Sequence, residues 1–120
     1  MDILIVESDP NLGELWQRHM LRQDMNARLV SDQNGAIKAL QTRRFDVLVL
    51  DLVLRQGSAL AVADYAGFRH PDTKIVFVTN TSFFSDGSIF AFNANARAFL
   101  QSDMPPEDLT AMVAHYAQSG

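Results

Sequence analysis

The chain alternates short runs of consecutive apolar residues with longer stretches in which apolar positions recur every three or four residues. The first pattern is typical of buried parallel strands, and the second of amphipathic helices that pack against them. Three of the runs (ILIV, VLVL and IVFV) contain no polar residue, as expected of strands that helices cover on both faces. The predicted strands span 3–6, 27–30, 47–50, 75–78 and 98–100. The pattern therefore predicts a doubly wound, three-layer α/β fold around a five-stranded parallel sheet.

Helix-start signals lie between the predicted strands. Asp9 followed by Pro10 predicts the N-cap and the first residue of the first helix, because a proline at that position loses no hydrogen bond. Further helices are expected from Asn34-Gly35, over 58–68, from Ser85 and from Pro105-Pro106-Glu107. The length of 120 residues leaves room for one core, so one domain over residues 1–120 is expected.

Composition narrows the classes of function. The formal charge is −4 and the basic residues are scattered, so direct nucleic-acid binding is not expected. Cysteine is absent, which excludes thiolate metal sites and a Cys nucleophile and fits a cytoplasmic protein. No apolar run approaches the ~20 residues that span a bilayer, so no membrane association is expected. No nucleotide-binding or hydrolase motif is present, so an enzyme is not expected either.

Polar residues follow three of the predicted strands. Glu7 and Asp51 come directly after continuously apolar runs, and Thr79 follows the fourth strand. Ligands of doubly wound folds bind at the carboxyl ends of the strands, so these residues mark the expected site. A carboxylate there is unfavourable unless it is paired, hydrogen-bonded or metal-bound, and two together suggest a divalent cation such as Mg²⁺. The alternative for Asp51 is a turn residue that precedes the third helix.

Three motifs carry a resemblance to a known family. ILIVESDP, FDVLVLDLVL and KIVFVTN, at their observed spacing, resemble the opening, the phosphorylation-site strand and the fourth strand of response-regulator receiver domains of two-component signalling. The resemblance covers essentially the whole chain. It implies a flavodoxin-like fold with strand order 2-1-3-4-5 and five helices. It also implies Mg²⁺ as cofactor and a histidine kinase or phosphotransfer protein as partner.

The resemblance also implies roles for individual residues. Asp51 is the implied phosphoacceptor, and Glu7, Asp51 and the main-chain carbonyl of Val53 are the implied metal ligands. Thr79 matches the hydroxyl that binds a phosphoryl oxygen, and Phe99 occupies the aromatic switch position that works with it. The alternatives are that Thr79 simply finishes a strand and that Phe99 is an ordinary core residue.

The chain departs from the family pattern at several positions. Ser8 stands where the family has the Asp that ligates Mg²⁺ directly, so weak Mg²⁺ binding is expected. Asp9 either substitutes as a metal ligand or caps the first helix. Ser102 and Asp103 replace a Lys-Pro pair, and an uncharged Ser cannot supply the lysine's charge. Arg55 replaces a proline, and it either reaches back over the crevice or remains a solvated loop residue.

Two functions remain open. The leading interpretation is a receiver that accepts a phosphoryl group on Asp51 and signals through the face formed by the fourth helix, fifth strand and fifth helix, where a homodimer would also form. The alternative is a phosphorylation-independent module for dimerisation or protein binding, which the residues Ser8, Ser102 and Asp103 favour. Its apolar anchors would come from Phe83, Phe84, Phe90 and Phe92.

Overall fold

Five parallel strands form one sheet in the order β2-β1-β3-β4-β5. The structure is a computed structural model that describes residues 1–80 and 95–118. The strands are β1 (Asp2–Val6), β2 (Asn26–Val30), β3 (Val47–Asp51), β4 (Lys74–Thr79) and β5 (Ala96–Gln101). Each contains a predicted apolar run, so the predicted doubly wound fold and its strand order are confirmed.

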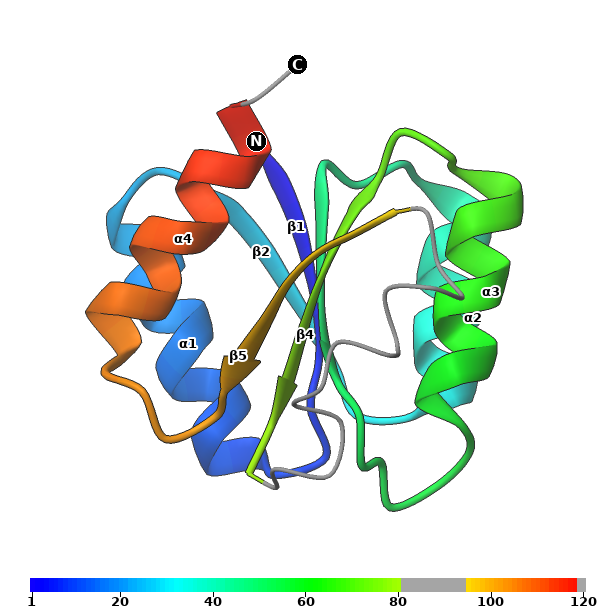
Figure 1. Ribbon diagram of the computed structural model, residues 1–120, viewed down its shortest axis with the longest axis horizontal. Coiled ribbons are helices and arrows are strands. Elements are labelled where there is room, and N and C mark those ends of the chain that lie inside the picture. Colours follow the sequence, from blue (N-terminus) through cyan, green and yellow to red (C-terminus); the bar gives the residue numbers. More distant parts are fainter. Residues whose placement is uncertain (81–94, 119–120) are drawn as a thin grey trace.

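Helices cover both faces of the sheet. They are α1 (Pro10–Arg22), α2 (Gln33–Thr42), α3 (Ala59–Arg69) and α4 (Pro106–Gln118). Figure 1 shows α1 and α4 on one side of the sheet and α2 and α3 on the other. Helix α4 is the fifth helix of the sequence prediction. The fourth predicted helix, with its four phenylalanines, lies outside the described residues. No helix in the described part of the chain is long and apolar enough to span a membrane.

Side chains cap the helices much as the sequence predicts. Asp9 accepts hydrogen bonds from the amides of Asn11 and Leu12 at the start of α1, so the predicted N-cap is confirmed. The predicted start of the second helix at Asn34 is one residue too late. Asp32 is its N-cap and accepts from the amide of Gly35, so α2 already begins at Gln33.

Two apolar cores fill the space between the sheet and its helices. Side chains alternate across a strand, so Leu48 and Leu50 of β3 pack under α2 and α3, while Val47 and Val49 pack under α1 and α4. The largest buried side chains are Trp16 in the second core and Phe45 and Phe77 in the first. Because β1 and β3 contribute to both cores, the sheet couples the two halves of the molecule.

The amino edge of the sheet is held by a polar network. The side-chain amide of Asn95 donates to the main-chain oxygens of His70 and Thr73. The main-chain oxygen of Asn95 accepts from the main-chain amide of Ile75. The Thr73 hydroxyl donates to the Phe45 oxygen at 2.6 Å. These bonds fix the starts of β4 and β5, which places their far ends at the opposite edge, where the arrowheads of Figure 1 point.

Candidate functional site at the carboxyl edge of the sheet

Main-chain hydrogen bonds continue past the strand ends at the candidate site. The amide of Glu7 donates to the Val30 oxygen at 3.0 Å, just beyond β1. The amide of Leu52 donates to the Val78 oxygen at 2.9 Å, just beyond β3. These bonds extend the sheet by one residue at each point, so the residues that begin the loops are held as firmly as the strands.

Glu7 and Asp51 are the two side chains that the structure brings together at this edge. Glu7 directly follows β1 and Asp51 ends the adjacent strand β3, and their carboxyl groups lie within hydrogen-bonding reach of each other. Glu7 is only 4% exposed. Its Oε2 accepts from the Asp9 amide at 3.0 Å, and its Oε1 is buried without a hydrogen-bond partner among the described residues. Asp51 Oδ1 accepts from the Val53 amide at 2.9 Å.

The environment of Glu7 favours its protonated form. The pKa of Glu7 is raised from 4.5 to about 8, chiefly by burial and also by the adjacent Asp51 carboxyl group, while the hydrogen bond from the Asp9 amide opposes the change. Two ionised carboxylates can only accept hydrogen bonds, so one of them must hold a proton to bond the other. A bound cation would serve the same purpose by replacing that proton.

The remaining residues of the predicted pocket lie on β4 and β5. Thr79 ends β4 next to β3 and is fully buried. By the alternation along β4, Thr79 lies on the same face as Ile75 and Phe77, which pack under α2 and α3, whereas Glu7 and Asp51 continue the opposite face of β1 and β3. Phe99 is half-buried against the core under α2 and α3. The structure thus joins Glu7 to Asp51 and places Thr79 at the neighbouring strand end.

The family lysine position is occupied by a buried serine. Ser102 is 8% exposed, and its amide donates to the Thr79 oxygen at 2.8 Å. Asp103 is exposed. The backbone therefore carries position 102 to the edge of the sheet beside Thr79, but the side chain there has no charge.

Ser8 has no carboxylate, and the carboxylate of Asp9 is engaged at the start of α1. The Ser8 hydroxyl donates to the Ser31 oxygen at 2.8 Å and accepts from the Arg55 amide at 3.0 Å. Asp9 Oδ1 is occupied by the first two free amides of α1. Across residues 1–80 and 95–118, no group of three or more His, Asp or Glu side chains is arranged to hold a metal ion.

Arg55 lies over a polar hollow beside the carboxylate pair. The hollow has a volume of about 230 Å³ and is lined by Ser8, Ser31, Asp32, Arg55 and Gln56. The Arg55 side chain is exposed, and within the described residues it forms no ion pair with Glu7 or Asp51. Of the two expectations for Arg55, the structure therefore agrees with the solvated loop residue.

The donor set at the edge fits a hard divalent cation with few negative ligands. Glu7 and Asp51 offer carboxylate oxygens, one of which, Glu7 Oε1, is buried and has no hydrogen-bond partner among the residues that the structure describes. Oxygen donors of this kind are what Mg²⁺ prefers, and it completes its shell with water where the protein offers few.

Sequence reasoning missed the contacts that join the loops. Gln33 Oε1 accepts from the Ser58 amide at 2.8 Å, and the Gln33 amide donates to the Gln56 oxygen at 3.3 Å. These bonds, like those of Ser8, run to main-chain atoms of loops far away in sequence. No residue pattern marks such a partner, because every residue type presents the same main-chain oxygen.

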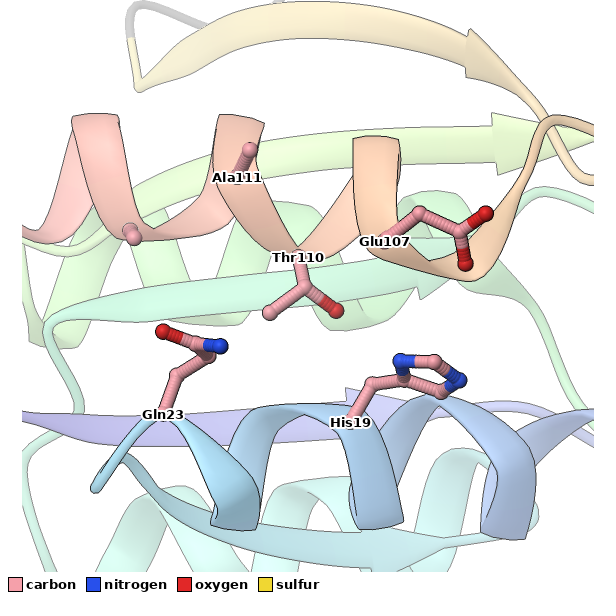
Figure 2. Close-up of a pocket in the computed structure, with 6 residues that line it drawn as sticks. His19, Gln23, Glu107, Thr110 and Ala111 are labelled. Carbon is pink, nitrogen blue, oxygen red and sulfur yellow. The ribbon is translucent and has the colours of Figure 1, made fainter.

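A second hollow lies between α1 and α4, away from the carboxylate pair. It has a volume of about 200 Å³, and Figure 2 shows His19 of α1 and Gln23, which follows α1, projecting toward Thr110 of α4, with Glu107 at one end. The Thr110 hydroxyl donates to the Pro106 oxygen within its own helix. This hollow holds a single carboxylate, so it does not offer the paired acids found at the sheet edge.

A five-stranded doubly wound sheet with an acidic pair at its carboxyl edge defines a receiver-type signalling domain. The chain belongs to the family of response regulator receiver domains, whose family model matches residues 3–114. The resemblance stated from the sequence motifs is confirmed.

Individual relatives agree with this assignment. The response regulator protein PilR of Pseudomonas aeruginosa is 30% identical over 111 residues, which cover 92% of this chain and 25% of PilR. The transcriptional regulatory protein RprY of Bacteroides fragilis is 24% identical over 90% of this chain and 45% of its own length. The chain thus spans a quarter to under half of these relatives.

Solved structures share the fold. A CheY-like receiver domain from Methanospirillum hungatei has a TM-score of 0.87 at 19% identity, with 97% of this chain and 92% of that one covered. The response regulator TrrA of Thermotoga maritima, solved in complex with Mg²⁺-BeF, has a TM-score of 0.83 at 21% identity, with 96% and 97% covered.

Family membership settles the general function. The chain is a receiver domain of a two-component response regulator. Such domains are signalling modules and generally not enzymes, they interact with histidine kinases or phosphotransfer proteins, and they generally bind Mg²⁺ at the phosphorylation site.

Proposed function

We propose that this receiver accepts a phosphoryl group on Asp51 from a histidine kinase or phosphotransfer protein. The observation that carries the proposal is the pairing of Glu7 and Asp51 at the carboxyl edge of the sheet. In the transfer, a P–N bond of the partner's phosphohistidine breaks, its electron pair stays with the imidazole, and a P–O bond to the Asp51 carboxylate forms. The Val53 amide, bonded to Oδ1, holds the carboxylate in one orientation for this reaction.

The proposed metal ligands are Glu7, Asp51 and the main-chain carbonyl of Val53. Mg²⁺, when bound, supplies the positive charge that the phosphoryl oxygens require. Glu7 must release its proton before it can bind Mg²⁺. Its raised pKa and the absence of a carboxylate at Ser8 therefore both support weak Mg²⁺ binding. We assign to Thr79 the hydroxyl that binds a phosphoryl oxygen, and to Thr79 and Phe99 the switch that carries the signal to the surface of β5 and α4.

Intact-mass spectrometry tests the proposal. The protein is incubated with acetyl phosphate and Mg²⁺, alongside Asp51→Asn and a sample in which EDTA removes the metal. One added phosphoryl group is expected on the wild-type chain only, and only with Mg²⁺ present. An adduct that persists in Asp51→Asn, or a wild type that stays unmodified at millimolar Mg²⁺, contradicts the proposal.

A second function is favoured by two observations at the same edge. Ser8 is engaged in loop contacts, and position 102 carries no charge, so the chain lacks two of the family's phosphate-handling groups. Both observations favour a module that binds its partner without phosphorylation, and that partner could be a second copy of the chain. Self-association that is equal in the wild type and in Asp51→Asn, by analytical ultracentrifugation with acetyl phosphate present, distinguishes this function from the first.

A further inference from the structure

The Ser8 hydroxyl joins two loops that are distant in sequence. It donates to the oxygen of Ser31, which follows β2, and accepts from the amide of Arg55, which follows β3. These partners lie 23 and 47 residues away from Ser8. A single half-buried side chain therefore connects the ends of β1, β2 and β3 at the edge where the carboxylate pair lies.

A hydroxyl group can make both of these bonds from position 8, which an ionised carboxylate cannot. A hydroxyl donates one hydrogen bond and accepts others, whereas an ionised carboxylate only accepts. An Asp at this position could accept from the Arg55 amide but would face the Ser31 oxygen with a second acceptor. The exchange of the family acid for Ser therefore adds a structural contact as well as removing a metal ligand.

A short stretch of backbone links the contact between Ser8 and Arg55 to Asp51. Arg55, which Ser8 holds by its amide, lies two residues after Val53, and the Val53 amide holds Asp51 Oδ1. The far end of the same loop is fixed by Gln33, which bonds the Ser58 amide and the Gln56 oxygen. Ser8 thus supplies an anchor between these bonds at the far end of the loop and the bond from the Leu52 amide to the Val78 oxygen, which holds the loop where it leaves β3.

We infer that Ser8 is a positioning residue, whose hydroxyl holds the β3–α3 loop against the β2–α2 loop and thereby fixes the orientation of the Asp51 carboxylate. The functional effect of that orientation rests on the proposed phosphorylation of Asp51. The positioning itself is a property of the unmodified chain. It can therefore be measured without any phosphoryl donor.

Residue-resolved amide hydrogen exchange by NMR tests the inference in the wild type, Ser8→Ala, Ser8→Thr and Ser58→Ala. Ser58→Ala is the matched control, because the Ser58 hydroxyl caps α3 by accepting from the Ala61 amide and, within residues 1–80 and 95–118, joins no second loop. In Ser8→Ala we expect exchange to become about tenfold faster at Arg55 and several-fold faster at Val53. Ser8→Thr should restore both rates, and Ser58→Ala should leave both unchanged.

The amide of Val49, inside β3, reports global unfolding in the same spectra. Unchanged exchange at Arg55 and Val53 in Ser8→Ala, an equal increase at Val49, or failure of Ser8→Thr to restore protection would each overturn the inference. Failure of the wild type to accept phosphate from acetyl phosphate is a separate result. It would reject the proposed function while the amide rates still decide whether Ser8 positions the loop.

Discussion

At the scale of single residues, Glu7 is an acidic side chain that the fold has almost completely removed from water. It is nearly fully buried next to a second carboxyl group, and its pKa is raised to about 8 chiefly by that burial. The unfolded chain loses this proton near pH 4.5, while the folded chain keeps it until about pH 8. The folded state therefore binds more protons across this interval, and the free energy of unfolding must fall as the pH rises through it.

Replacing Glu7 by Gln should remove most of this pH dependence. Gln resembles the protonated acid in shape and never ionises, so Glu7→Gln should match the wild type near pH 4.5 and exceed its stability by about 4 kcal/mol at pH 8 without Mg²⁺. Urea unfolding at pH 5, 6.5 and 8, with EDTA present, measures the difference. A gap that shrinks as the pH rises would show that the pKa of Glu7 is not raised in the folded chain.

Ser102 is the residue whose replacement should increase the rate of phosphorylation. Its amide is fixed to the Thr79 oxygen, so Ser102→Lys would restore a cation at the family position beside the proposed phosphoryl group. We expect the rate of phosphorylation by acetyl phosphate to rise about tenfold, because the added charge stabilises the charge that develops during transfer. Gln101→Lys, which adds the same charge at an exposed neighbouring position, should leave the rate near that of the wild type.

Residue identity predicted some contacts of the site and not others. The pairing of Glu7 with Asp51 and the capping by Asp9 could be predicted, because strand ends and N-cap positions follow from local patterns. The bonds of Ser8 could not, because their partners are main-chain atoms of two other loops. Thr79 was placed on the correct strand end, but the contacts of its side chain depend on packing that no local pattern encodes.

At the scale of elements, the start of α1 depends on one side chain. Asp9 accepts from the Asn11 amide at 3.0 Å and from the Leu12 amide at 3.4 Å. Asp9→Ala should lower the free energy of unfolding by about 1 kcal/mol, and Asp9→Asn, which keeps the cap, should lose much less. Chemical denaturation at pH 7 compares the three chains. Equal losses in both variants would mean that the charge of Asp9 matters rather than its hydrogen bonds.

The β3–α3 loop contains a glycine that its conformation requires. Gly57 has a φ of +89°, and a Cβ at this position would lie 2.3 Å from the Gln33 Cβ. Gly57→Ala should therefore destabilise the fold by roughly 1–3 kcal/mol, since both the backbone and the packed side chain resist the change.

Gly67 inside α3 provides the control for this substitution. A Cβ there would meet Asn95 Oδ1 at 3.9 Å among the described residues, which is ordinary contact. Gly67→Ala should stabilise the helix by about 0.5–1 kcal/mol. Thermal unfolding followed by circular dichroism should thus move in opposite directions for the two variants, and a shift of the same sign in both would contradict the assignment of strain to Gly57.

The elements themselves followed closely from the pattern of apolar residues. Each described strand begins and ends within two residues of its predicted run, because three of them are continuously apolar and the edge strands stand between clear helix signals. The start of α2 was misplaced because Asp32 and Asn34 are both good N-cap residues, and only the bond from Gly35 to Asp32 decides between them.

At the scale of the whole molecule, two cores share one sheet. Trp16 lies in the core under α1 and α4, while Leu48 lies in the core under α2 and α3. Strand β3 nevertheless contributes to both, through Leu48 and Leu50 on one face and Val47 and Val49 on the other. Losing the packing on one face must therefore weaken the strand that supports the opposite face, so the domain should unfold as a single unit.

Leu48→Ala tests this coupling with a probe on the far side of the sheet. The substitution removes a fully buried side chain and should lower the free energy of unfolding by about 2–5 kcal/mol. The fluorescence of Trp16, the single tryptophan, reports the opposite core, so its unfolding midpoint in urea should fall with that of the circular dichroism signal. If the Trp16 midpoint stayed at the wild-type value while the ellipticity changed earlier, the two cores would be independent. The proposed switch of Thr79 and Phe99 requires that a change at the sheet edge reach a distant surface, and the sheet that both cores share joins the two faces of the molecule.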